Sequence, residues 1–292
     1  MHRTPRPGLT AAALALALVT ACAPDSAPTA HTGSSPRAPA DTRARLTTAL
    51  PADPVRMVLP ATGAESRWTQ GLDVFVRQVG QAEAVSCARE RGASLPVSAP
   101  AAFIRFGEVP DLDFIARHGT SESATVPTPT ANPTGTRPAT AAEIRTCLAQ
   151  GAATTDALRD RYAEVQGAWF GTIASLRRDP ATLRAGRSLP DCFARHGVQA
   201  HDEPSYFALA DRLMRNPDAS ELSSREHTLG QVYAACMRPV EAVRDPARAQ
   251  LRTRFLIDPE HADAVETVRT TLVRALRAAE KRYGIPLVFP AP

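Results

Sequence analysis

The chain has few aromatic residues and lacks the short motifs that identify common enzymes. Aromatic residues make up 5% of its 292 residues, whereas β-sandwiches favour aromatic and β-branched side chains. No H-E-x-x-H, G-x-S-x-G, S-x-x-K, phosphate-binding loop or dinucleotide fingerprint occurs in the sequence. No convincing alternation of polar and apolar residues marks a strand either. These absences count against the enzyme classes that the motifs identify and favour an all-α fold.

Lysine is nearly absent, and no long basic run occurs. Lys281 is the only lysine among the 34 Lys and Arg residues, which we interpret as the codon bias of a GC-rich genome. Without Arg3 and Arg6, 32 basic residues face 30 acidic ones. This balance excludes nucleic acid as an expected partner.

The one long apolar run stands at the N-terminus. Arg3 and Arg6 supply positive charge before the apolar segment Leu9–Thr20. A membrane span needs about 20 apolar residues, so this shorter run is typical of a signal peptide rather than of a transmembrane helix. With no second long run, the sequence predicts that the protein is exported and does not span the membrane.

Small residues directly precede Cys22, as in the cleavage site of a bacterial lipoprotein. The segment Val19-Thr20-Ala21-Cys22 predicts removal of residues 1–21 and attachment of lipid to the Cys22 sulfur. The alternative is an ordinary secretory signal cleaved nearby. Lipidation predicts a protein attached to the outer face of the cytoplasmic membrane by its acyl chains, because two chains suffice for stable anchoring.

Four cysteines remain after Cys22, and an even number in an oxidising compartment predicts two disulfides. Three connectivities are possible. We favour Cys87–Cys147 with Cys192–Cys236, because Cys87 and Cys192 both stand in a Cys-x4-Gly segment near a predicted helix end and a further cysteine helix follows each. A metal site is not expected, because no C-x2-C pair occurs.

The pattern along the chain predicts an irregular helical bundle cross-linked by two disulfides. Residues 22–64 are expected to be a disordered tether and an irregular lead-in, and residues 65–292 a helical domain. Two similar halves, residues 65–178 and 179–292, would each hold one disulfide. The segment 120–139 is rich in Pro and Thr and is expected to be a long loop.

Helix boundaries are predicted from capping patterns. Thr140 with Glu143 and Ser223 with Glu226 have the spacing of a capping box. Asp245-Pro246 and Asp258-Pro259 are typical of an N-cap followed by the first helical residue, and Pro239 is expected to bend or end its helix. One long helix is expected to carry the apolar positions Leu158, Tyr162, Val165, Trp169, Ile173 and Leu176.

The cysteine segments resemble those of a broad group of secreted or lipid-anchored actinobacterial proteins of unknown function. The matching parts are Cys87 to Gly92, Arg105-Phe106-Gly107 with His118-Gly119, Cys147, Cys192 to Gly197, and Glu226 to Cys236. The chain departs from the group at Ala88 and Phe193, where methionine is usual. The resemblance covers residues 65–284 and implies a helical envelope protein with two disulfides, without assigning chemistry or a cofactor.

Polar residues that could form a site are few. The densest cluster comprises His196, His201, Asp202 and Glu203, which could hold a metal or act in acid–base chemistry; the alternative, which we favour, is a solvated loop after a helix. No metal or cofactor is therefore predicted. Trp68 and Trp169 could stack on a ligand, but Trp169 falls on the apolar stripe and is expected in the core.

Three hypotheses for function remain. The first is a non-enzymatic envelope module that binds a cell-wall polymer or an envelope protein. The second is a wall-directed hydrolase that uses carboxylates among Asp111, Asp113, Asp202 and Glu203, as paired carboxylates can come from any part of a chain. The third is an accessory structural lipoprotein without a ligand. The absence of catalytic motifs favours a protein that is not an enzyme.

Overall fold

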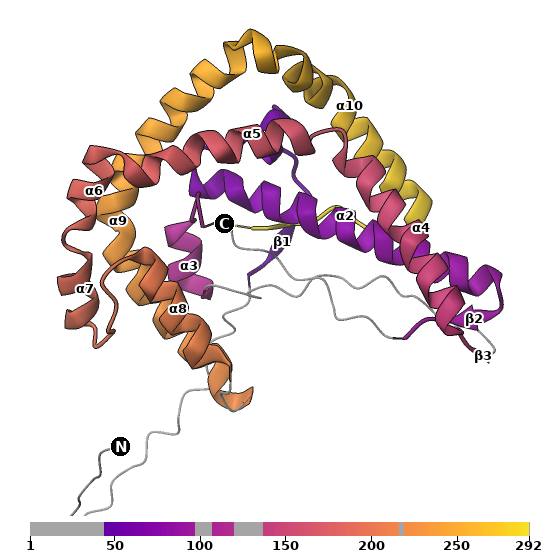
Figure 1. The fold of residues 1–292 in the computed structure, drawn as a ribbon, viewed down its shortest axis with the longest axis horizontal. Helices are drawn as coiled ribbons and strands as arrows, with labels where there is room; N and C mark the ends of the chain where they lie inside the picture. Colours follow the sequence, from indigo (N-terminus) through magenta and orange to yellow (C-terminus); the bar gives the residue numbers. More distant parts are fainter. Residues whose placement is uncertain (1–43, 97–106, 120–136, 216–218, 292) are drawn as a thin grey trace, which may run out of the picture. The chain divides into compact units, whose positions relative to one another are not determined.

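The computed structural model of the protein describes residues 44–96, 107–119, 137–215 and 219–291. These residues lie in one compact unit that spans residues 41–292. The signal peptide, Cys22, the proposed tether 22–41 and most of the Pro/Thr-rich segment 120–139 lie outside the described residues. The predicted all-α class is confirmed (Figure 1), because the only strands in the described ranges are two residues long.

The strands form two small pairs. Strand β1 (Leu46–Thr47) pairs antiparallel with β4 (Phe289–Pro290), which joins the beginning and the end of the described chain. Strand β2 (Ala93–Ser94) pairs in parallel with β3 (Arg137–Pro138). Neither pair is large enough to form a layer, so helix packing carries the fold.

Helix α2 (Gly63–Glu90) packs along α4 (Ala141–Arg159) at very close range. Glycines make this approach possible: a Cβ at Gly80 would lie 2.8 Å from the Gly151 carbonyl oxygen, and a Cβ at Gly151 would lie 2.4 Å from that of Gly80. The Cys87–Cys147 disulfide joins the same two helices. Gly92 follows α2 with a φ of +68°, as its predicted position after the helix requires.

Both predictions at Thr140 and at Asp258 are confirmed. Thr140 and Glu143 form a capping box at the start of α4, and the Asp258 side chain accepts a hydrogen bond from the Glu260 N–H at the start of α10 (Pro259–Tyr283). Helix α10 ends at Tyr283, and its C-cap Gly284 has left-handed backbone geometry.

The apolar stripe from Leu158 to Leu176 was expected on one helix, and this prediction is wrong. Helix α4 ends at Arg159, the chain turns over residues 160–162, and α5 (Ala163–Ala174) with the short 3-10 helix η1 (Ser175–Arg178) follows. Periodicity could not detect the interruption, because Leu158 and Tyr162 still pack on the same core on either side of it.

The first core lies among α2, α5, α10 and the short helix α1 (Val55–Val58). Its largest fully buried side chain is Trp169, whose Nε1 donates to the Pro60 carbonyl oxygen at 2.9 Å. Trp68 packs at the edge of this core and donates to the Ala49 carbonyl oxygen at 3.2 Å. Trp169 is therefore in the core, as its spacing predicts.

The second core is built by short helices against the long helix α9 (Ala219–Ile257). The short helices are α3 (Leu112–His118), α6 (Pro180–Gly186), α7 (Leu189–Arg195) and α8 (Glu203–Met214). The Cys192–Cys236 disulfide joins α7 to α9, so the favoured connectivity of both disulfides is confirmed. Both cores draw on residues from either side of position 178, so packing crosses the proposed boundary between the halves.

Two predicted boundaries within α9 are wrong. The helix begins at Ala219, before Ser223, so Ser223 lies inside it rather than at its N-cap. It also continues through Pro246, so Asp245-Pro246 does not begin a helix; of the two outcomes expected at Pro239, a bend or an end, the end does not occur. In both cases the tertiary packing of a 39-residue helix overrides a local signal that would hold for an isolated segment.

Candidate functional site

The predicted polar cluster does not assemble into one site. His196 is an exposed residue at the C-terminal end of α7, and His201 is exposed before α8. Asp202 is the N-cap of α8, where its side chain accepts a hydrogen bond from the Ser205 N–H at 2.8 Å. These contacts agree with the solvated-loop interpretation for the three residues.

Glu203 faces the other way, into the second core. Its carboxylate accepts a 2.5 Å hydrogen bond from the Tyr233 hydroxyl and pairs with Arg244 Nη1 at 3.0 Å. The side chain therefore links α8 to α9, which the sequence did not indicate.

The other carboxylates proposed for hydrolysis are also engaged separately. Asp111 is buried, pairs with Arg67 Nε at 2.5 Å and caps α3 by accepting from the Phe114 N–H. Asp113 is exposed and pairs with Arg238 Nη2 at 2.7 Å, and this contact lowers its pKa. No pair of the proposed carboxylates lines the cavity described below.

Two groups of side chains in the described residues have metal-ligand spacing. Cys192, His196 and Cys236 form one group, but both cysteines are consumed by their disulfide. Asp258, Glu260 and His261 form the other at the exposed start of α10, where Asp258 is the helix cap. Neither group offers three free ligands that the fold holds for a metal.

A buried ion network surrounds Arg248 of α9, which is 1% exposed. Its Nε and Nη1 donate to the carbonyl oxygens of Ala61 and Glu108, and its Nη2 pairs with Glu241 and Asp245. Burial raises the pKa of Glu241 despite its arginine partners. Because every guanidinium nitrogen of Arg248 has a partner, the network is best explained as a structural link between α9 and the segments before α2 and α3.

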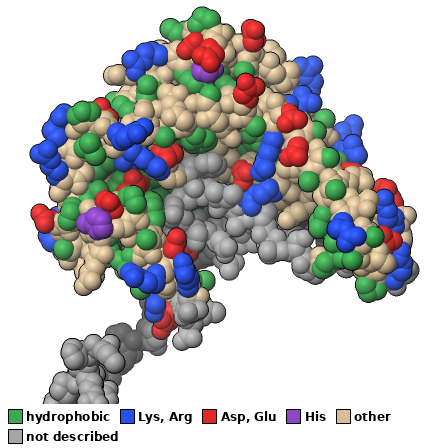
Figure 2. Space-filling model, viewed as in Figure 1, with side chains coloured by type: hydrophobic (Ala, Val, Ile, Leu, Met, Phe, Trp, Pro, Cys, Tyr) green, Lys and Arg blue, Asp and Glu red, His purple; other side chains and the backbone are tan. Residues whose placement is uncertain are grey.

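Charges on the surface are mixed. In Figure 2, basic and acidic side chains alternate over the visible described surface, and many form ion pairs such as Arg225 with Glu221. The visible face therefore presents no single-sign patch of the kind that would indicate a strongly charged partner.

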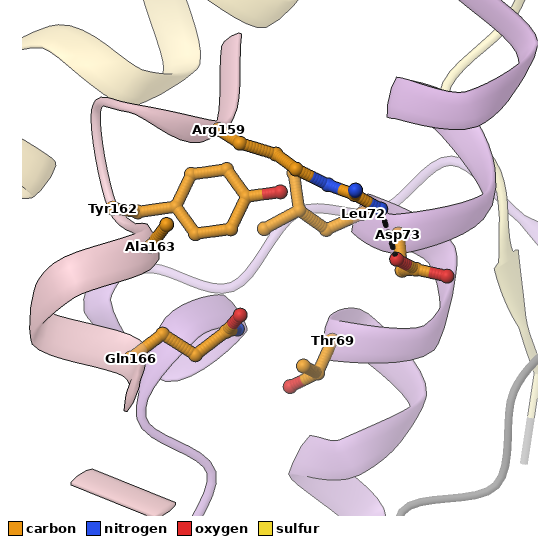
Figure 3. Close-up of a pocket in the computed structure, with 7 residues that line it drawn as sticks. All are labelled: Thr69, Leu72, Asp73, Arg159, Tyr162, Ala163 and Gln166. Carbon is orange, nitrogen blue, oxygen red and sulfur yellow. Dashed lines mark hydrogen bonds and ion pairs between the residues drawn. The ribbon is translucent and has the colours of Figure 1, made fainter. Parts of the chain in front are cut away.

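A small cavity between α2 and α5 is the candidate site (Figure 3). Its volume is about 140 Å³, and it is lined by Thr69, Leu72, Asp73, Arg159, Tyr162, Ala163 and Gln166. Thr69 and Asp73 stand four residues apart on α2, and Tyr162 and Gln166 four apart at the start of α5, so each pair lies on one helix face. The turn at residues 160–162 sets the two walls apart and brings Arg159 over the end of the cavity.

One wall of the cavity carries oxygen atoms without a hydrogen-bond partner. Thr69 is 1% exposed, and its Oγ1 has no partner within the described structure. Oδ2 of Asp73 is also buried without a hydrogen bond, although Arg77 Nη2 lies 3.0 Å away as an ion-pair partner. Buried polar atoms are normally satisfied, so the Thr69 oxygen, which has neither a hydrogen bond nor an ion pair, calls for a ligand or water.

The opposite wall and the end of the cavity supply further polar groups. Burial raises the pKa of Tyr162 to about 12, so its hydroxyl stays neutral. Arg159 Nη2 pairs with Asp73 Oδ1 at 3.0 Å across the cavity. Gln166 Nε2 makes a long 3.4 Å contact with the Val58 carbonyl oxygen. The cavity can therefore donate and accept hydrogen bonds on both sides.

The sequence does not predict this site. The spacing of Tyr162 predicts a position on an apolar stripe, and no motif marks the other polar lining residues, Thr69, Asp73, Arg159 and Gln166. The i, i+4 spacing of polar residues was present, but on a helix that spacing is typical of solvated faces as well. Only the tertiary contact of α2 with the start of α5 distinguishes a cavity wall from a solvated helix face.

Comparison of the chain with models of known families, with curated proteins and with solved structures returned no match. Within the described residues, no helix has the length and apolar character required to cross a bilayer.

Proposed function

We propose that the protein is a lipid-anchored envelope module that binds a cell-wall polymer without catalysing a reaction. The observation that carries the location is the signal segment ending in Val19-Thr20-Ala21-Cys22. The two disulfides support the same location, because stable disulfides are typical of proteins outside the cytoplasm. Lipid on Cys22 would hold the mature chain at the outer face of the cytoplasmic membrane.

Binding rather than catalysis is proposed because of how the polar groups are arranged. The carboxylates suggested for hydrolysis are held apart in caps and ion pairs. The cavity between α2 and α5 combines a neutral phenol, an amide, a hydroxyl and a compensated ion pair. These groups suit recognition of a polar ligand, because the phenol stays neutral and the Asp73 carboxylate is already paired with Arg159.

The anchor is tested by changing Cys22 to alanine in the full-length chain. The variant should leave the membrane fraction and appear in the medium or soluble extract. Ser26→Ala, a change of similar size four residues later, is the matched control and should stay with the membrane. A Cys22→Ala protein that remains in the membrane fraction would contradict the anchor.

The binding role is tested by retention on isolated cell wall and by crosslinking in intact cells. A wall-binding module should be retained on washed wall material and released by soluble wall fragments. Crosslinking to one envelope protein, without wall retention, would replace the wall polymer by a protein partner. If neither occurs, the accessory role without a ligand is favoured.

A further inference from the structure

We propose that the α2–α5 cavity binds one edge of a neutral sugar ring, presented by an exposed residue of a wall glycan. This inference rests on the proposed function, because it names the ligand of the wall-binding module.

Size limits the ligand to a group rather than a chain. An engineered cavity of about 150 Å³ takes a benzene molecule, and the α2–α5 cavity is about 140 Å³. It can therefore receive about six non-hydrogen atoms, which corresponds to part of a sugar ring with adjacent hydroxyls. Leu72 and Ala163 supply apolar contact for the C–H groups of such a ring.

Thr69 Oγ1 and Asp73 Oδ2, which make no hydrogen bond, could each accept one from a ligand. Eight threonines in the described helices donate their hydroxyl to the carbonyl oxygen four residues earlier, which is the usual arrangement within a helix. Thr69 is also helical and makes no such bond. Its Oγ1 and Asp73 Oδ2 lie along one wall, where hydroxyl groups of a ligand could donate to both.

Charge argues for a neutral ligand. Asp73 already faces two cations, Arg159 at 3.0 Å and Arg77 at 3.0 Å. A cationic ligand would therefore meet two arginines, whereas an anionic ligand would meet the Asp73 carboxylate, whose Oδ2 makes no hydrogen bond although Arg77 pairs with it. A neutral hydroxyl can donate to this oxygen and accept from Gln166 or Tyr162, so it matches both walls.

The test measures binding of methyl glucoside, methyl mannoside and methyl galactoside to the purified mature protein by saturation-transfer NMR and calorimetry. At least one should bind saturably, with a Kd on the order of 1 mM, as expected for a ligand with few contacts. Glucuronate and glucosamine should bind at least about ten-fold more weakly than the neutral sugar. Equal binding of all three charge types, or no saturable binding, would overturn the proposal.

Two variants probe the cavity, and a third is their control. Thr69→Val removes the free hydroxyl and should weaken binding about ten-fold, the loss of about one hydrogen bond. Ala163→Leu adds carbon atoms at an exposed lining position and should abolish binding while the helical circular dichroism stays unchanged. Thr172→Val, also on α5 but outside the cavity, should bind as the parent does. Full binding by Ala163→Leu would exclude this cavity as the site.

Failure of this inference is distinguishable from failure of the proposed function. Wall retention that methyl glycosides do not compete for would reject the cavity and keep the wall-binding module. Saturable sugar binding by a protein that does not associate with membrane or wall would keep the cavity and reject the envelope role.

Discussion

Helix α2 meets its two neighbours in opposite ways. Around Gly80 and Cys87 it packs against α4 with no room for a methyl group and is joined to it by a disulfide. Around Thr69 and Asp73 it faces the start of α5 across a cavity of about 140 Å³. Both neighbours come from the same stretch of chain, divided by the turn at residues 160–162.

The buried polar groups on the two parts of α2 also differ in how many hydrogen-bond partners they have. Glu83, on the α4 side, accepts hydrogen bonds from Gln150 at 2.5 Å and Tyr283 at 2.7 Å and pairs with Arg282 at 3.3 Å. Thr69 Oγ1 and Asp73 Oδ2, on the α5 side, lack hydrogen bonds. A satisfied buried group stabilises a contact, whereas an unsatisfied one costs free energy that a ligand can recover. The difference separates a structural contact from a candidate binding site.

The largest expected effect comes from removing the Cys87–Cys147 disulfide. A cross-link between residues 60 apart in sequence contributes about 4 kcal/mol to stability in the chain-entropy model, with a typical range of about 2–5. The double variant Cys87→Ala/Cys147→Ala should lose a free energy of unfolding in this range in urea denaturation. If the variant still folds, sugar binding in the α2–α5 cavity should persist. Loss of binding in a folded variant would show that the cavity depends on the α2–α4 contact.

Gly151→Ala should give the next largest loss. Its Cβ would lie 2.4 Å from the Gly80 carbonyl oxygen, and overpacking of this kind costs about 1–3 kcal/mol. Gly167→Ala on α5 is the matched control, because its Cβ would meet no atom within 4 Å. The control should be neutral or up to about 1 kcal/mol more stable, owing to the higher helix propensity of alanine. Equal effects at the two glycines in urea denaturation would refute the close approach of α2 and α4.

Glu83 makes the α2–α4 region sensitive to acid. The hydrogen bond from Tyr283, with further contributions from Gln150 and Arg282, holds the pKa of Glu83 below its ordinary value of 4.5. A lowered carboxyl pKa stabilises the fold above the ordinary value, and this stability is lost as pH falls through the lowered pKa. Glu83→Gln should therefore lose stability at about pH 7 and flatten the acid dependence of the urea midpoint. An unchanged acid dependence would show that Glu83 does not contribute to it.

Thr69→Val should have the smallest effect on stability and its main effect on binding. Valine has the shape of threonine without the unpartnered hydroxyl, so the free energy of unfolding should stay equal or rise by up to about 1 kcal/mol. Thr155→Val on α4 is the matched comparison, since its hydroxyl donates to the Val76 carbonyl oxygen at 3.4 Å. That change should cost about 0.5 kcal/mol, as expected for a long hydrogen bond. A larger loss in the free energy of unfolding for Thr69→Val than for Thr155→Val would contradict the claim that the Thr69 hydroxyl has no partner.

Local signals predicted much of the fold. The capping box at Thr140, the cap at Asp258 and the position of Gly92 just after α2 depend on neighbouring residues only, and all three are confirmed. The repeated Cys-x4-Gly pattern also identified the disulfide pairing. Predictions that depend on tertiary packing were wrong where a long helix or a turn overrode the local pattern, as at Ser223, Pro246 and residues 160–162.

The candidate site could not be predicted from the sequence, because it too depends on tertiary packing. The predicted site was chosen because its polar residues are close together in sequence. In the structure they do not form one site, because Glu203 points into the second core whereas His196 and His201 are exposed to solvent. The cavity joins residues far apart in sequence, such as Thr69 and Gln166, which are separated by 97 positions. A missing hydrogen bond at Thr69 is a property of the folded environment and leaves no sequence signal.

The most direct test of the account is methyl NMR on the purified mature protein during titration with the neutral methyl glycoside that binds most tightly. The resonances of the Thr69 and Ala163 methyl groups report on the cavity, and those of Ala84 and Thr155 report on the α2–α4 contact. We predict saturable shifts at Thr69 and Ala163, with the Ala84 and Thr155 resonances unchanged. Shifts confined to Ala84 and Thr155, or no saturable shift at Thr69, would contradict the claim that the unsatisfied side of α2 is the binding side.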